Sequence, residues 1–134
     1  MRIRLQLPET VLCKTQISVR ATDMNYAGHL GNDRILAYAQ ECRHAWLDAK
    51  GMNELDVHGA SIVVADAAIQ FQAEGFVGDN LCGTLYLGEP NKYGFDLYYQ
   101  FENQNGVIVA TVKTAILFRE SGSLCSPPKG LFNT

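Results

Sequence analysis

One stretch of this chain has the pattern of a long amphipathic helix, and every other patterned stretch reads as a β-strand. The apolar stripe of the helix consists of residues spaced four, three and four apart: Ile35, Ala39, Cys42 and Trp46. Asn32 is a favourable N-cap, and Gly51 suits the position just beyond the last turn. We therefore expect a helix of four to five turns that begins at Asn32 or Asp33.

Five strand-like runs surround this helix. One run precedes it and alternates, with Val11, Cys13, Ile17 and Val19 on one side. The runs occupy residues 11–20, 61–72, 80–88, 92–102 and 107–119. The segment Asn103-Gln104-Asn105-Gly106 between the last two runs is a hairpin signal. Residues 52–60 read as a loop with room for a short helical turn, and the tail around Ser126-Pro127-Pro128 as irregular.

This order predicts an α+β fold, in which a curved antiparallel sheet wraps around one long central helix. Residues 1–134 form one domain, with a core over about 11–120 and an irregular C-terminal tail. The run 61–72 is apolar on nearly both faces, and a single helix covers only one of them. We therefore expect a second subunit on the other face, giving a homodimer or a dimer of dimers.

Composition excludes several classes of function. The chain has 11 basic and 14 acidic residues, for a net charge of −3, which argues against general nucleic-acid binding. No apolar run approaches the roughly 20 residues that span a bilayer, and the N-terminus lacks the apolar core of a signal peptide. The four cysteines form no C-x-x-C pair and read as reduced thiols, so we expect a cytoplasmic protein.

The loop of residues 23–32 carries the residue types that perform acid–base chemistry. Asp23, Asn25 and His29 lie within seven residues, and Gly28 and Gly31 let the backbone approach a ligand just before the helix. Free N–H groups at a helix N-terminus can stabilise a developing negative charge while a neighbouring side chain moves a proton or attacks.

This loop resembles that of the hotdog-fold thioesterases of the 4-hydroxybenzoyl-CoA thioesterase group. Members of that group commonly carry Asp-x-x-Gly-His-Val-Asn-Asn before the central helix and Glu-x-x-Arg or Glu-Ala-Arg within it. Here Asp23 stands for the aspartate, residues 28–32 for Gly-His-Val-Asn-Asn, and Glu41-Cys42-Arg43 for the helix element. Residues 76–81 resemble the group's Gly-Asp-x-Leu strand entry, so the resemblance spans roughly residues 11 to 120.

The chain departs from this pattern at three places. Two extra residues separate Asp23 from Gly28, Gly31 replaces the first asparagine, and Ile35 stands where tyrosine is frequent. The Asp-Met-Asn segment followed by a histidine also resembles the Asp-x-Asn-x-His motif of plant-type acyl-carrier-protein thioesterases.

The resemblance implies hydrolysis of the thioester of an acyl-CoA, or alternatively of an acyl carrier protein, with water as second substrate. It implies no metal and no organic cofactor, because coenzyme A is part of the substrate. In this interpretation Asp23 attacks the carbonyl or activates water, and the N–H of Asn32 polarises the thioester carbonyl. His29 and Asn25 orient these groups. The competing structural interpretation makes Asp23 and Asn32 a turn former and a helix cap.

Six further residues are candidates for binding substrate: Tyr26, Gly28, Gly31, Glu41, Ser61 and Asp66. Glu41 lies at the edge of the apolar stripe, where it either faces solvent or reaches the mouth of the site. Asp66 interrupts an apolar strand, which is costly for a carboxylate unless it is paired or exposed, and it is a candidate to face a partner subunit's site. Ser61 begins the same strand.

Two other functions remain open. Hotdog-fold hydratases and dehydratases also use an aspartate and a histidine, in the pattern Asp-x-Asn-Pro-x-His, but this loop has no proline and an Asp-to-His spacing of six. A non-catalytic acyl-CoA sensor usually carries a DNA-binding domain, for which this chain has no room. No phosphate-binding loop, dinucleotide fingerprint, metal-ligand spacing or Gly-x-Ser-x-Gly motif occurs.

Overall fold

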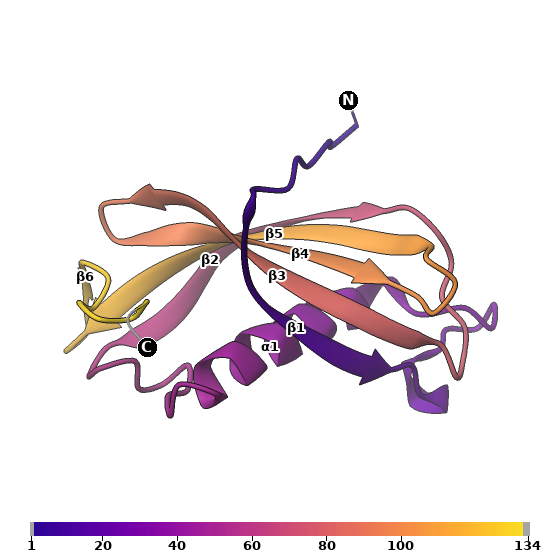
Figure 1. Cartoon of the computed structure of the whole chain (residues 1–134), viewed down its shortest axis with the longest axis horizontal. Helices are drawn as coiled ribbons and strands as arrows, with labels where there is room; N and C mark the ends of the chain where they lie inside the picture. The colour runs from indigo at the N-terminus through magenta and orange to yellow at the C-terminus, as the bar shows by residue number, and fades with distance from the viewer. Residues whose placement is uncertain (1, 133–134) are drawn as a thin grey trace.

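The computed structural model describes residues 2–132, in which one helix packs against a six-stranded antiparallel sheet. The sheet order is β1-β3-β4-β5-β2, with the short β6 paired to β5. The elements are β1 (Thr10–Ser18), the 3-10 turn η1 (Ala21–Asp23), α1 (Asn32–Asp48), β2 (Ser61–Phe71), β3 (Asn80–Asn91), β4 (Gly94–Glu102), β5 (Ile108–Glu120) and β6 (Ser123–Cys125). Figure 1 shows α1 lying along one face of the twisted sheet. The expected α+β fold is confirmed.

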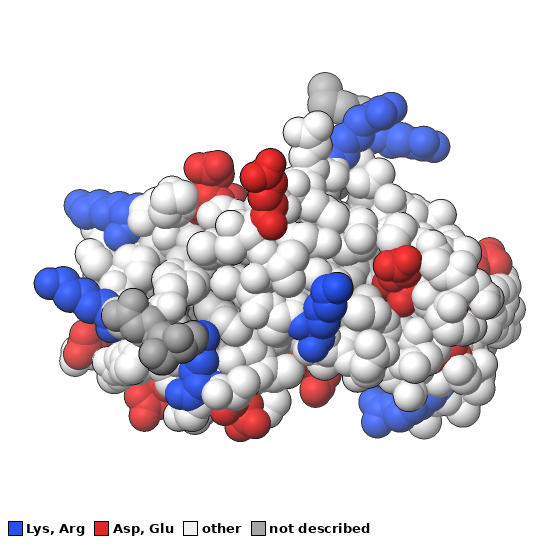
Figure 2. Space-filling view, viewed as in Figure 1, with Lys and Arg blue, Asp and Glu red and all other residues white. Residues whose placement is uncertain are grey.

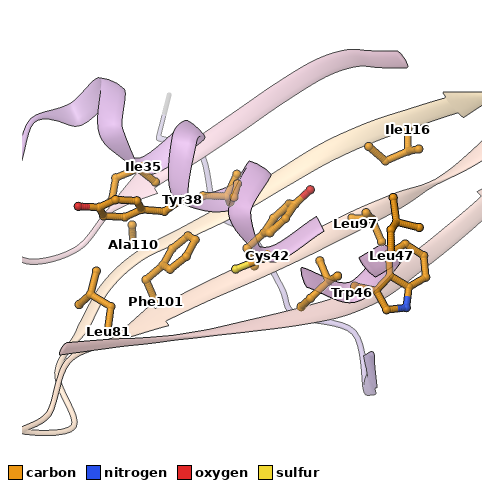
Figure 3. Close-up of a cluster of buried hydrophobic side chains, with 14 of the residues drawn as sticks. Ile35, Tyr38, Cys42, Trp46, Leu47, Leu81, Leu97, Phe101, Ala110 and Ile116 are labelled. Atoms are coloured by element: carbon orange, nitrogen blue, oxygen red, sulfur yellow. The ribbon is translucent and has the colours of Figure 1, made fainter. Parts of the chain in front are cut away.

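The helix buries the stripe that its sequence predicts. Its four members, Ile35, Ala39, Cys42 and Trp46, are at most 4% exposed. They meet side chains of the sheet in one apolar cluster (Figure 3). The N-cap is Gly31, one residue before the expected Asn32. At the other end Gly51 has a φ of +74°, which glycine adopts without strain and which ends the helix.

The sheet presents alternate residues to the helix, as a period of two requires. In β4 the inward-facing residues Phe95, Leu97, Tyr99 and Phe101 are all buried. The β4–β5 hairpin forms where the Asn-Gly segment predicts it. The N–H of Asn103 donates to the carbonyl of Val107 at 2.9 Å, and Gly106 takes a φ of +78°.

Two local expectations before the C-terminal tail are wrong. Val11 is 48% exposed because a bulge between Val11 and Cys13 shifts the alternation of β1. Residues 52–60 contain no helical turn but two tight turns, closed by bridges between Asn53 and Asp56 and between Val57 and Ala60.

The C-terminal tail is irregular only after residue 125. Residues 123–125 form β6, a strand that the sequence patterns did not predict. Beyond it Leu131 is buried, and the ring of Phe132 stacks on Trp46 with centroids 6.0 Å apart. The tail therefore closes one end of the core, while the end of the expected tail at residues 133–134 lies outside the described residues.

Strand β2 lies at the edge of the sheet and is more exposed than its apolar sequence predicts. Val64 is 41% exposed and Phe71 50%, and Ala65 and Ala67 between them are also exposed. A long apolar edge strand offers unpaired backbone groups to another strand.

The four cysteines are free thiols, as expected. Cys42 is wholly buried on the apolar side of α1, and burial raises its pKa to about 12. It therefore acts as a small apolar residue of the core.

Charged side chains are interspersed on the face of the molecule in Figure 2, with acidic and basic groups spread singly among uncharged residues. Over residues 2–132, α1 is too short and too polar to cross a membrane.

Candidate active site

A cavity of about 320 Å³ lies beside the N-terminal end of α1. Its polar residues come from three places in the chain: Asn25 and His29 from the loop before the helix, Asn32 from the first turn, and Gln72 and Glu74 from the segment after β2. Its apolar wall contains Leu30, Ile35, Phe71 and Val109. Ligand cavities are typically of this size and combine an apolar wall with a few converging polar groups.

The loop that carries His29 is closed by Asn25. The side-chain Oδ1 of Asn25 accepts hydrogen bonds from the N–H of Ala27 at 3.0 Å and of His29 at 3.2 Å. Its own N–H donates to the carbonyl of His29 at 2.8 Å. Gly28 takes a φ of +77°, which this tight turn requires. Asn25 therefore sets the conformation from which the imidazole projects.

The segment after β2 is attached directly to this loop. The N–H of Leu30 donates to the carbonyl of Gly75 at 2.8 Å. A Cβ at position 75 would lie 2.9 Å from two carbons of the Leu30 side chain, so the close approach depends on glycine. Glu74 is thereby held next to the loop although it follows it by some 45 residues in the sequence.

The imidazole of His29 lies between two groups of that segment. Its Nε2 is 3.2 Å from Oε2 of Glu74. The ring of Phe76 contacts it edge-on, with centroids 5.5 Å apart and planes at 85°. The His29 side chain is 35% exposed and that of Glu74 62%, so both groups remain open to solvent at the mouth of the cavity.

Asn32 is the first residue of α1, directly after the N-cap Gly31. The first N–H groups of a helix have no partner within it and carry the positive end of its dipole. The N–H of Gly31 is already committed to the carbonyl of Asp23 at 2.9 Å, and that of Arg34 to Gly31. This geometry leaves the N–H of Asn32 suited to stabilise an anion in the cavity.

Asp23 does not share this cavity. It lines a second one, of about 470 Å³, on the other side of the helix start together with Arg20, Arg34 and Tyr38. Its side chain is 1% exposed. Oδ2 accepts hydrogen bonds from the hydroxyl of Tyr38 at 2.6 Å and the N–H of Arg20 at 3.1 Å.

The electrostatics of Asp23 suit a structural anion. Burial acts to raise the pKa of its carboxyl. The hydrogen bonds from Tyr38 and from the N–H of Arg20, with the guanidinium groups of Arg20 and Arg34, outweigh burial and hold the pKa below its ordinary value. The carboxylate is thus ionised but enclosed by donors.

The expectation that Asp23, Asn25, His29 and Asn32 meet in one site is therefore corrected: the last three share the first cavity, and Asp23 does not. Counting back from Gly28-His29 explains why. In the motif Asp-x-x-Gly-His the carboxylate stands four residues before the histidine, and Asn25 occupies that position here. With that spacing, the position of the motif's aspartate falls on Asn25, two residues after Asp23.

The remaining candidates are scattered. Glu41 lines the second cavity, Tyr26 is fully exposed, and Gly31 is buried against Asp23. Ser61 lies at the end of β2 opposite to Phe71, where its hydroxyl donates to the carbonyl of Arg119 at 3.4 Å.

Asp66 lies on the exposed edge strand and binds Nζ of Lys113 at 2.9 Å. This ion pair and the exposure of the strand are enough to stabilise a carboxylate there, without a contact from a partner subunit.

Glu74 was not predicted to be functional. The only local signal was an acidic residue beside Gly75, in the short connection between two predicted strands. Ordinary loops have the same composition, so this signal did not point to a site. Within residues 2–132 no three His, Cys, Asp or Glu side chains converge in a way that would hold a metal ion.

The family model described as the thioesterase-like superfamily matches residues 19–131. The chain belongs to this superfamily, and its class of activity is the hydrolysis of thioesters. No curated protein sequence matches it.

Similar solved structures have the same fold. The 1,4-dihydroxy-2-naphthoyl-CoA thioesterase Slr0204 from Synechocystis is 18% identical with a TM-score of 0.79, over 87% of this chain and 89% of that one. A hypothetical protein from Aquifex aeolicus is 21% identical with a TM-score of 0.82, over 89% and 95%. The PA2801 protein of Pseudomonas aeruginosa, a putative thioesterase by its name, is 20% identical with a TM-score of 0.79, over 89% and 92%. These likenesses confirm the expected hotdog fold.

Proposed function

We propose that the chain hydrolyses acyl-CoA thioesters in the cavity at the start of α1. The observation that carries this proposal is that Asn32, the first residue of α1, lines the same cavity as His29 and Asn25. A thioester carbonyl against that N–H would have its developing negative charge stabilised, and the loop side chains would lie on the side from which water arrives. The dihydroxynaphthoyl-CoA thioesterase of similar fold makes an acyl-CoA the first substrate class to test.

The wall of the cavity supports an acyl group as the part of the substrate that enters. Leu30, Ile35 and Val109 are apolar and come from the loop, the helix and β5. A thioester seated with its carbonyl at Asn32 would direct its acyl group toward these side chains, and its coenzyme A moiety toward solvent. An acyl carrier protein would present the same thioester and is the alternative donor.

Water is the second substrate in this proposal, and the reaction needs no metal ion and no organic cofactor. The four free thiols fit a reducing compartment, and we place the enzyme in the cytoplasm.

We also propose that the functional unit is a homodimer, or a dimer of dimers, that pairs through β2. This strand is the sheet edge with exposed apolar residues, and an exposed edge of this kind is a template for a second strand. Phe71 at the end of β2 lines the first cavity. Pairing through β2 would therefore place each active site close to the subunit interface.

The test is a panel of aromatic and aliphatic acyl-CoAs, with release of free thiol followed by a thiol-reactive chromogen. We expect thiol release with at least one member, at a rate that Asn32→Pro reduces. Loss of the enoyl chromophore of crotonyl-CoA without thiol release would instead identify a hydratase, and no turnover of any member would contradict an enzymatic function.

A further inference from the structure

We propose that Glu74 and His29 form the acid–base pair of this site, in which Glu74 orients the imidazole and His29 takes the proton from the attacking water. This inference rests on the thioester hydrolysis proposed above. It assigns the proton transfer to residues other than Asp23 and its hydrogen-bond partners. One of the two, Glu74, was not singled out by the sequence patterns.

The first argument is the composition of the cavity. Within residues 2–132, Glu74 is the only carboxylate that lines it and His29 the only imidazole. The two are in contact, with Nε2 and Oε2 3.2 Å apart. A carboxylate against one nitrogen of an imidazole fixes the tautomer, so that the other nitrogen carries the lone pair. With Glu74 at Nε2, that lone pair is on Nδ1.

The second argument is that the contact is built into the fold. Asn25 fixes the backbone of His29 through the hydrogen bond that its Oδ1 accepts. The N–H of Leu30 fixes Gly75, and therefore Glu74, through a 2.8 Å hydrogen bond. The ring of Phe76 supports the imidazole from the side. Two segments far apart in sequence are thus joined at the residues that flank the pair.

The third argument is the state of the rival carboxylate. Oδ2 of Asp23 accepts two hydrogen bonds, and only 1% of the side chain is exposed. A nucleophile or general base must reach the substrate or water with a free lone pair. The exposed Glu74–His29 pair meets this requirement, whereas Asp23 faces Tyr38 and two guanidinium groups.

The step balances without any further reactant. Nδ1 of His29 accepts a proton from water, and the hydroxide oxygen forms a bond to the thioester carbonyl carbon. The oxyanion that results is stabilised by the N–H of Asn32. When the carbon–sulfur bond breaks, the thiolate leaves with the electron pair and takes the proton from the imidazolium, releasing a free acid and a thiol. Glu74 stabilises the imidazolium between the two transfers.

The experiment compares kcat of Glu74→Gln, Glu74→Asp and His29→Ala with that of the wild-type enzyme, on the best acyl-CoA of the panel. The matched control is Glu89→Gln, an exposed carboxylate that lines neither cavity. We expect Glu74→Gln to lower kcat roughly ten- to hundredfold and His29→Ala about 10²- to 10⁴-fold. Glu74→Asp should restore part of the loss, and Glu89→Gln should match the wild type.

Added imidazole distinguishes proton transfer from a structural role. It should raise the rate of His29→Ala in proportion to its concentration and leave Glu74→Gln unchanged, with thermal melting confirming that each variant is folded. The inference is overturned if the wild type hydrolyses a thioester while Glu74→Gln keeps more than half of its kcat, or if imidazole does not rescue folded His29→Ala. A wild type that releases no thiol from any acyl-CoA overturns the proposed function and this inference together.

Discussion

The hydroxyl of Tyr38 donates a 2.6 Å hydrogen bond to Oδ2 of Asp23, and both groups are buried. Burial, and then the hydrogen bond to Asp23, raise the pKa of Tyr38, so its hydroxyl keeps its proton and acts as the donor. This contact ties the helix to the turn that precedes the site loop. The carbonyl of Asp23 also accepts the N–H of Gly31, so the same residue holds both the turn and the N-cap.

Replacing Asp23 with asparagine should therefore lower stability. The amide can still accept from Tyr38, but it loses the charge that faces Arg20 and Arg34. We expect the free energy of unfolding at pH 7 to fall by about 1–3 kcal/mol, as for lost hydrogen bonds to a charged group. Urea unfolding measures this, and Tyr38→Phe should cost a similar amount by removing the donor. Full retention of stability in both variants would contradict the anchoring role.

The lowered pKa of Asp23 predicts how the stability of the protein depends on pH. Its pKa is lower in the folded protein than in the unfolded chain, so its contribution to stability is complete above the unfolded value, about 3.9, and is lost as the pH falls through the folded value. Asp23→Asn should therefore flatten the fall in stability with acidification below about pH 4. Unfolding free energies measured from pH 6 to pH 2.5 would show parallel curves for wild type and variant if Asp23 made no such contribution.

Trp46 should be among the costliest core residues to truncate. It is 4% exposed, and its ring lies against Phe95 and Phe132 with centroids 6.4 Å and 6.0 Å away. Trp46→Ala should cost roughly 3–5 kcal/mol, as large-to-small core substitutions do. The exposed Leu36 of the same helix, 42% exposed, is the control, since Leu36→Ala removes much less buried surface. A loss below about 1 kcal/mol at Trp46 would contradict the packing of the tail.

The helix, its phase and the succession of strands along the chain could be predicted because periodicity and turn residues act locally. The stripe from Ile35 to Trp46 and the turn at Gly106 each contain their own signal. The site could not be predicted as well. The approach of Glu74 to His29 depends on the hydrogen bond between Leu30 and Gly75, which joins segments that no local pattern relates. No local pattern tells whether an aspartate in a loop faces substrate or a tyrosine, so the sequence could not show that Asp23 lines a different cavity from His29.

The exposed edge strand should mediate self-association. Light scattering at micromolar concentration should give at least twice the monomer mass of 14.8 kDa. Val64→Lys places a charge on the exposed edge strand, which disfavours pairing with a second strand, and should shift the protein toward monomer. Leu55→Lys is the control, because Leu55 is 85% exposed in a loop outside β2. A wild-type monomer, or an equal effect of both substitutions, would rule out assembly through β2.

The substitution Asn32→Pro removes the backbone N–H of Asn32 with little other change to the helix. Proline is favoured at the first position of a helix, where its missing N–H breaks no helical hydrogen bond, and the ψ of 139° at Gly31 is one that a following proline accepts. Asn32→Pro should therefore keep the fold but lower kcat about 10²- to 10³-fold, the usual cost of losing one oxyanion donor. Asn32→Ala retains the N–H and removes only the side chain, so its kcat should stay far closer to that of the wild type. If the two variants lose activity equally, the side chain of Asn32 and not its N–H contacts the substrate. If Asn32→Pro is folded and fully active, the thioester carbonyl does not bind at the start of α1.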